Sequence, residues 1–141
     1  MARGGRASIS INFSKVEKNL QVVMRRVERG TKKATIAAAE EILADSLSQV
    51  PRDTNALALS AYYRIMGVSK NFSAEIGYGG NGDPVNPKTG RRASEYMVVV
   101  HEDLSAKHTT GNAKFLERPV ASYQLKFGAK IADILRDEVG W

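Results

Sequence analysis

The chain has 141 residues, enough to bury one hydrophobic core, and its 43% hydrophobic and 26% charged residues are typical of a single folded domain spanning residues 1–141. The absence of cysteine excludes disulfides and thiolate metal sites, and no apolar run is long enough to cross a membrane. A formal net charge of +6 favours acidic partners such as DNA, but the basic residues are scattered and lack the interleaved aromatics that stack on bases.

The amino-terminal region predicts a short strand followed by a helix. Residues 1–7 carry no apolar run, so we expect a flexible N-terminus and a protein that acts in the cytoplasm or in a particle assembled there. Residues 8–13 alternate polar and apolar side chains, which is typical of a strand with one apolar face. A helix is expected next, because Ser14 and Glu17 have the spacing of a capping box.

Two sets of apolar residues follow along the helical region. The first recurs at helical spacing from Val16 to Val27, and the second runs from Ile36 to Val50. The nine-residue step from Val27 to Ile36 is a rotation of about 900°, so the two stripes lie on opposite faces of a straight helix. Two interpretations stay open: the chain breaks near Gly30, or one long helix has its own sheet on one side and another subunit on the other.

The next segment predicts a helix end and a β-hairpin. Pro51 is expected to end the helix, because it lacks an N–H and its ring pushes the preceding residue out of the helical conformation. Residues 61–69 and 72–78 then have the composition and alternation of strands. A turn at residues 70–71 joins them into an antiparallel hairpin.

A long loop is expected at residues 79–95, which are dense in Gly and Pro and have little to bury. Structureless loops of this length are uncommon inside a compact domain and are often functional or disordered. Two interpretations stay open: a mobile surface loop, or an arm that orders on a neighbouring subunit or on DNA. The basic side chains that such an arm would present are Lys88, Arg91 and Arg92.

The carboxyl-terminal part predicts a short buried segment at residues 96–100 and one further helix. Apolar residues keep helical spacing from Leu116 to Ile134 over five turns, and Pro119 is tolerated near the first turn. The predicted fold class is therefore α+β, with a long N-terminal helical region, a small mainly antiparallel sheet with a long loop, and a C-terminal helix packed on the sheet.

One cluster has metal-ligand or acid–base potential, and it consists of His101, Glu102, Asp103 and His108. Its spacing argues against a metal site, because the adjacent His101 and Glu102 point in different directions in either a strand or a helix. The sequence has no nucleophile motif and no phosphate-binding loop that precedes a helix. We therefore expect no catalytic residues, no metal and no cofactor. A metal-dependent nuclease or hydrolase that uses this cluster is the least favoured of three functional hypotheses, and the other two are given below.

Three stretches together resemble one known family. Val-Pro-Arg-Asp-Thr-Asn-Ala-Leu-Ala-Leu-Ser at residues 50–60 resembles the Val-Pro-x-Asp-Thr-Gly-x-Leu-x-x-Ser signature that follows the first helix in the HK97 gp10-like family of tailed-bacteriophage proteins. The segments at residues 96–102 and 111–119 resemble its Tyr-Ala-x-x-Val-His-Glu and Lys-Phe-Leu blocks, the latter opening the final helix. Order and spacing match over about residues 30–138, and Asn55 replaces the usual glycine.

This resemblance implies a structural subunit of a phage head–tail connection, not an enzyme. Such neck, tail-completion or tail-terminator proteins form homo-oligomeric rings of about six copies at the head–tail joint of the virion, assembled in the bacterial host cytoplasm. The implied partners are further copies of the chain, connector or portal proteins and tail-tube proteins, with non-specific contact to DNA passing through the ring and no membrane. A small basic nucleic-acid-binding module is the alternative.

The first motif also has a physical rationale. Asp53 and Thr54 are expected to cap a short helix at residues 55–60, Asn55 tolerates a left-handed turn, and Leu57 anchors the turn to the core. Aromatic residues with a polar tip are enriched in subunit interfaces, which adds Tyr62, Tyr63, Tyr96 and Trp141 as interface candidates. The candidate motif and interface residues are Pro51, Asp53, Thr54, Leu57, Tyr62, Tyr63, Tyr96, His101, Glu102, Lys114, Phe115 and Leu116.

Overall fold

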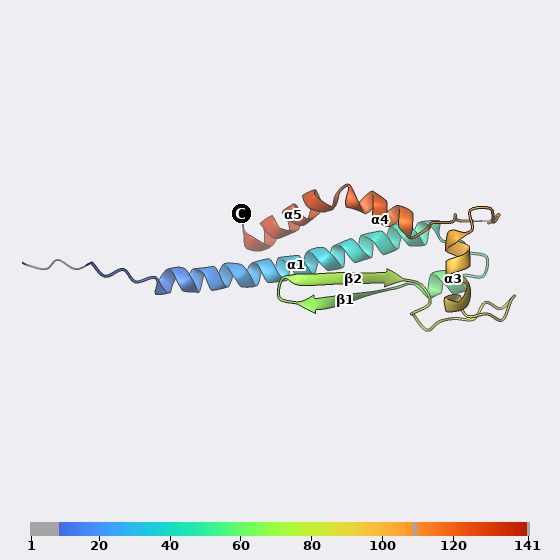
Figure 1. Cartoon of the computed structure of the whole chain (residues 1–141), viewed down its shortest axis with the longest axis horizontal. Coiled ribbons are helices and arrows are strands. Elements are labelled where there is room, and N and C mark those ends of the chain that lie inside the picture. Colours follow the sequence, from blue (N-terminus) through green and yellow to red (C-terminus); the bar gives the residue numbers. More distant parts are fainter. Residues whose placement is uncertain (1–8, 109, 141) are drawn as a thin grey trace, which may run out of the picture.

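The computed structural model describes residues 9–108 and 110–140 and shows an elongated α+β molecule (Figure 1). One long helix runs along most of it, with the hairpin on one side and the last two helices on the other. The predicted α+β class is confirmed. The elements in chain order are α1 (Ser14–Gln49), α2 (Ala56–Leu59), β1 (Tyr62–Val68), β2 (Asn71–Gly77), α3 (Ala93–Glu102), α4 (Glu117–Gln124) and α5 (Phe127–Val139).

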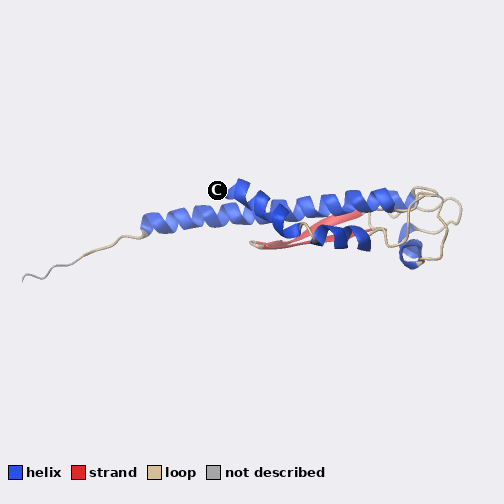
Figure 2. Ribbon diagram, turned by 90° about the horizontal axis from the view of Figure 1, so that it is seen from above, coloured by secondary structure: helices blue, strands red, loops and turns tan. Residues whose placement is uncertain are grey.

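The helix α1 is unbroken, so of the two interpretations the single long helix holds and the break near Gly30 does not occur. Gly30 is instead the point of closest approach to α5, since a Cβ there would lie 2.8 Å from the Leu135 side chain. The hairpin packs on the other side of α1. Near Gly30, the side of α1 that faces away from the hairpin is thus covered by the chain's own α5. The α4–α5 segment crosses over α1 when seen from above (Figure 2).

The strand predicted at residues 8–13 was wrong. Residues 9–13 form no strand and precede α1, and Ser8 lies outside the described residues. A strand needs an edge to pair with, and the only hairpin in the described part of the chain lies beside the middle of α1. The capping box was wrong as well, because Phe13 occupies the N-cap position and the Ser14 N–H donates to Asn12 Oδ1 at 2.9 Å.

The hairpin is confirmed with its turn one residue earlier than predicted. Val68 pairs with Asn71, so the turn consists of Ser69 and Lys70. Ser69 takes a positive φ of 59°, the left-handed conformation that tight hairpin turns require. On β2, Ile76 packs against the cluster on α1, as the predicted alternation implied.

The single C-terminal helix was also wrong, because it is two helices, α4 and α5. Leu125 and Lys126 separate the two helices, and the chain bends there although both residues keep right-handed helical dihedral angles. The Leu125 side chain is 91% exposed. Both helices pack mainly along α1 and not on the sheet. The bend lets α4 bury Tyr123 against α1 while α5 follows the same helix further on. Helical spacing alone carries no information on such a bend.

Ion pairs and two buried clusters hold the elements together. Glu138 of α5 pairs with Arg29 at 3.1 Å and with Lys33 at 2.6 Å, and Lys126 and Lys130 pair with Glu41. Within the described ranges no helix combines the length and hydrophobicity needed to cross a membrane. A smaller cluster lies along α1 and consists of Ala38, Ile42 and Tyr123. The larger cluster lies where α1 ends and consists of Val50, Leu57, Tyr78, Ala93 and Phe115.

Candidate functional site

The three motif stretches, which are separate in the sequence, meet where α1 ends. Phe115 is fully buried at their centre, with 0% exposure. Its ring meets the Tyr78 ring edge-on with centroids 5.1 Å apart, and it meets the His101 ring edge-on at 5.0 Å. Val50 and Leu57 from the first stretch belong to the same buried cluster. We call this region the motif junction.

The first stretch behaves largely as predicted. Val50 is extended with ψ of 136°, so α1 ends before Pro51. Asn55 is left-handed with φ of 60°, and Leu57 is buried. The capping role of Asp53 and Thr54 was wrong, because α2 has no side-chain cap. Asn55 itself occupies the N-cap position, which leaves Asp53 two residues too early.

The second stretch forms the helix α3, which is buried on one face only. Tyr96 and Val100 pack against the junction, whereas Val98 and Val99 are 61% and 64% exposed. The expectation of a buried segment at residues 96–100 was therefore only half right. The start of α3 is fixed by Asp83, which accepts hydrogen bonds from the Ser94 N–H at 2.8 Å and from its hydroxyl at 2.7 Å.

The third stretch connects α3 to α4 through Lys114. The Lys114 N–H donates to the His101 carbonyl at 2.7 Å, and Lys114 takes a left-handed φ of 59°. Its ammonium binds Glu102 and, at 2.9 Å, Glu117. The hydrogen bond from Lys114, followed by the one to His101, lowers the pKa of Glu102, and the bond to Glu102 raises the pKa of Lys114. The charged pair thus ties α3 to the start of α4.

Acid should weaken this tie in a way that depends on Glu102. A carboxylate whose pKa is lowered by folding stabilises the folded chain above its ordinary value of 4.5, and that stability is lost as the pH falls through the lowered value. Urea unfolding at about pH 7 and about pH 3 should therefore show a smaller acid-induced drop in midpoint for Glu102→Gln than for the unchanged chain. Glu17→Gln, on the exposed first turn of α1, should leave the drop unchanged. An identical drop in all three proteins contradicts the tie.

The possible metal ligands do not converge. No group of three or more potential ligands comes together in the described part of the chain. His101 Nδ1 lies 2.7 Å from Glu102 Oε1, and Asp103 Oδ1 accepts hydrogen bonds from Ser105. His108 instead lines a pocket, and its buried Nε2 has no hydrogen-bond partner among the described residues. These contacts give the metal-hydrolase hypothesis no geometric support.

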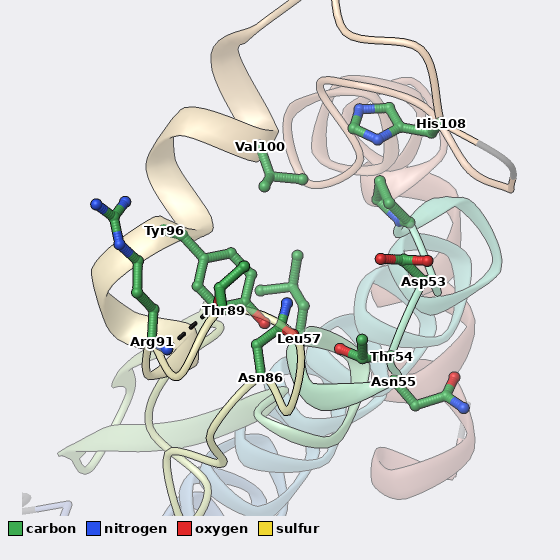
Figure 3. Close-up of a pocket in the computed structure, with 11 residues that line it drawn as sticks. Asp53, Thr54, Asn55, Leu57, Asn86, Thr89, Arg91, Tyr96, Val100 and His108 are labelled. Atoms are coloured by element: carbon green, nitrogen blue, oxygen red, sulfur yellow. Dashed lines mark hydrogen bonds between the residues drawn. The ribbon is translucent and has the colours of Figure 1, made fainter.

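The pocket beside the motif junction has a volume of about 320 Å³ (Figure 3). Its floor is apolar, with Leu57 and Val100, and polar groups including Asn86 and Arg91 surround it. The loop predicted at residues 79–95 forms one wall, but it ends earlier than predicted because α3 begins at Ala93. The loop is closed by its own hydrogen bonds, since the Asn86 N–H donates to the Arg91 carbonyl at 2.8 Å. Whether it orders on a partner stays a prediction.

Several candidate residues lie apart from the junction or are engaged within the chain. Tyr62 donates to Glu75 at 2.8 Å and Tyr63 to Glu40 at 2.9 Å, both on or beside the hairpin. Lys88 of the loop pairs with Asp53 at 2.7 Å. Trp141 lies outside the described residues. The exposed remainder of the basic loop is Arg91 and Arg92.

Sequence reasoning included two small residues in the motif stretches without assigning either of them a role at the junction. Ser60 is fully buried, donates from its hydroxyl to the Leu57 carbonyl at 2.6 Å, and accepts from the Gly79 N–H at 2.9 Å. Gly111 has φ of 80° and touches the backbone where α1 ends. The Gly-Asn pair at 111–112 is a turn signal that could have marked it.

Neither a family model nor any curated protein or solved structure matches this chain. The geometry of the junction and the exposed surfaces therefore carry the functional argument.

Proposed function

We propose that this chain is a structural subunit of a bacteriophage head–tail connection, which assembles with copies of itself into a ring. The observation that carries the proposal is the motif junction. Three separate stretches resemble one phage family, and residues of the first two pack against the buried Phe115 of the third. Residues that match the family's pattern also build one buried cluster. The resemblance and the packing therefore support each other.

The exposed surfaces also favour a protein that assembles. The first turns of α1 extend beyond the rest of the fold, and they carry exposed apolar side chains at Val16, Leu20 and Met24 (Figure 1). Large exposed apolar surfaces mark interaction sites. Catalysis has less support, because the charged side chains of Glu102, Lys114 and Glu117 bind one another and do not line the pocket beside the junction.

Ion pairs within the chain make the nucleic-acid alternative less favoured. Arg29 and Lys33 pair with Glu138, and Lys88 pairs with Asp53, so part of the basic charge is neutralised within the chain. In the proposed assembly, the partners are connector or portal proteins and tail-tube proteins, the location is the head–tail joint of the virion, and DNA passes without sequence-specific contact.

A genetic experiment tests the proposed location. The gene is expected to lie among portal, capsid and tail-tube genes, and its deletion should yield filled heads and free tails that do not join. Electron microscopy of the lysate gives the readout, and restoring the gene in trans should restore joined particles. Joined, infectious particles without the chain would refute the proposed role. DNA binding that persists at physiological salt in a chain encoded away from phage genes would favour the alternative.

A further inference from the structure

The first turns of α1 carry an apolar stripe that the described chain leaves largely exposed, with only Met24 bordering the hairpin turn at Ser69 and Lys70. It consists of Phe13, Val16, Leu20 and Met24, which are 65%, 52%, 58% and 55% exposed. Their spacing of three or four residues places them on one helical face. We call this set the amino-terminal stripe.

The stripe continues a face that α5 covers further along α1. Val27, about two turns beyond Leu20 and one turn beyond Met24, lies beside Leu135 and Val139 of α5. α5 ends at Val139 and covers α1 no further. Its end lies beside Arg26, which donates a hydrogen bond to the Val139 carbonyl at 3.2 Å. The same apolar face therefore extends about three turns past its intramolecular partner.

The surroundings of the stripe are basic. Residues 9–26 contain four basic side chains and one acidic side chain. The residues concerned are Lys15, Lys18, Arg25, Arg26 and Glu17. An occupant of the stripe should therefore offer apolar side chains together with negative charge.

The outer face of α3 has that chemistry. Val98 and Val99 are exposed there, and one helical turn to either side of them lie Glu95 and Glu102, which are also exposed. Residues 93–103 contain three carboxylates and no Lys or Arg. Although Glu102 also binds Lys114, its side chain remains 53% exposed. We call Glu95, Val98, Val99 and Glu102 the α3 outer face.

We propose that the amino-terminal stripe of one copy docks on the α3 outer face of a second copy. The two surfaces lie toward opposite ends of the elongated molecule, so the stripe of one copy cannot contact the α3 outer face of the same copy (Figure 1). Such a head-to-tail contact repeats from copy to copy and generates a ring when the rotation closes. This inference rests on the proposed self-assembly and names the two surfaces that produce it. Packing of stripe against stripe is disfavoured, because it would bring the basic surroundings of both copies together.

Two double variants distinguish this contact from a symmetric one. L20D with M24D removes the stripe and keeps the α3 outer face, whereas V98K with V99K removes the α3 outer face and keeps the stripe. Each variant alone should associate at least about tenfold more weakly than the unchanged chain. An equimolar mixture should form a 1:1 heterodimer and nothing larger, because a single productive contact remains. Sedimentation velocity and native mass spectrometry give the readout.

A matched control lies on the same helix. Val22 is 42% exposed but off the stripe, so V22D should assemble like the unchanged chain, and loss of assembly in this variant would overturn the proposal. Circular dichroism should show the same helix content in all variants.

The remaining outcomes separate the pairing from the proposed function. If the unchanged chain assembles but the mixture of the two double variants forms no heterodimer, the contact between stripe and α3 outer face is refuted. The proposed function is then unaffected. Self-association of the V98K and V99K variant at the unchanged strength indicates a symmetric stripe contact and also overturns it. An unchanged chain that stays monomeric at every concentration tells against both.

Discussion

Replacing Phe115 with alanine should lower the free energy of unfolding by about 3–5 kcal/mol, the range for deleting a fully buried aromatic side chain. Phe115 has 0% exposure and its ring contacts both Tyr78 and His101. Its removal leaves a cavity between the three motif stretches, which approach one another from different elements. The loss should therefore be among the largest that any single apolar truncation causes in this chain.

Chemical denaturation with urea measures this loss, and Phe127→Ala is the matched control. Phe127 is the same residue type but is 47% exposed at the start of α5, so its truncation should cost about 1 kcal/mol. A loss at Phe115 no larger than that at Phe127 would contradict the central position of Phe115 in the junction. The m-value should be unchanged in both variants if the cooperativity of unfolding is preserved.

The second large effect is expected at Gly111. Alanine there combines a positive φ of 80° with a Cβ that would lie 2.5 Å from the Gln49 carbonyl oxygen and 2.6 Å from the Pro51 nitrogen. These neighbours are backbone atoms and cannot move aside without shifting the end of α1. Strain and overpacking together should cost about 2–5 kcal/mol.

Gly90→Ala separates the clash from the backbone strain. Gly90 has a similar φ of 71° but nothing within 4 Å of an added Cβ, so its substitution should cost about 1 kcal/mol. Thermal and urea unfolding of both variants give the comparison. Equal costs would mean that Gly111 is constrained by its φ alone and does not pack against the end of α1.

Features set by local chemistry could be predicted from the sequence. Pro51 ends α1 because its ring acts on the residue directly before it, and Asn55 takes the left-handed turn because its own side chain tolerates it. The hairpin followed from alternation over neighbouring residues. The half-turn offset between the stripes of α1 also followed from spacing, and the structure has a partner on each side of the helix.

Features set by distant partners could not be predicted. The spacing from Leu116 to Ile134 indicates a helical face but not the bend at Leu125, which depends on how the chain follows α1. Residues 9–13 alternate like a strand but have no sheet edge beside them. Whether an apolar residue faces its own core or a partner is a tertiary property that periodicity does not encode.

The candidate site shows the same division. Motif positions such as Leu57 and Phe115 were recognised, but the sequence could not say that they meet in one buried cluster. Tyr96, a candidate for a subunit interface, is partly buried against the core of its own chain, and its role in an interface stays a prediction. An aromatic side chain with a polar tip suits either place, so its residue type does not distinguish them.

The molar mass of the purified chain in solution tests the proposed self-assembly most directly. Size-exclusion chromatography with light scattering should show a mass that rises with concentration from the 15.4 kDa subunit and levels off at one discrete multiple, as a closed ring requires. Negative-stain images of that fraction should show annular particles of one size. A mass that stays at 15.4 kDa at every concentration, with no annular particles, would contradict the account.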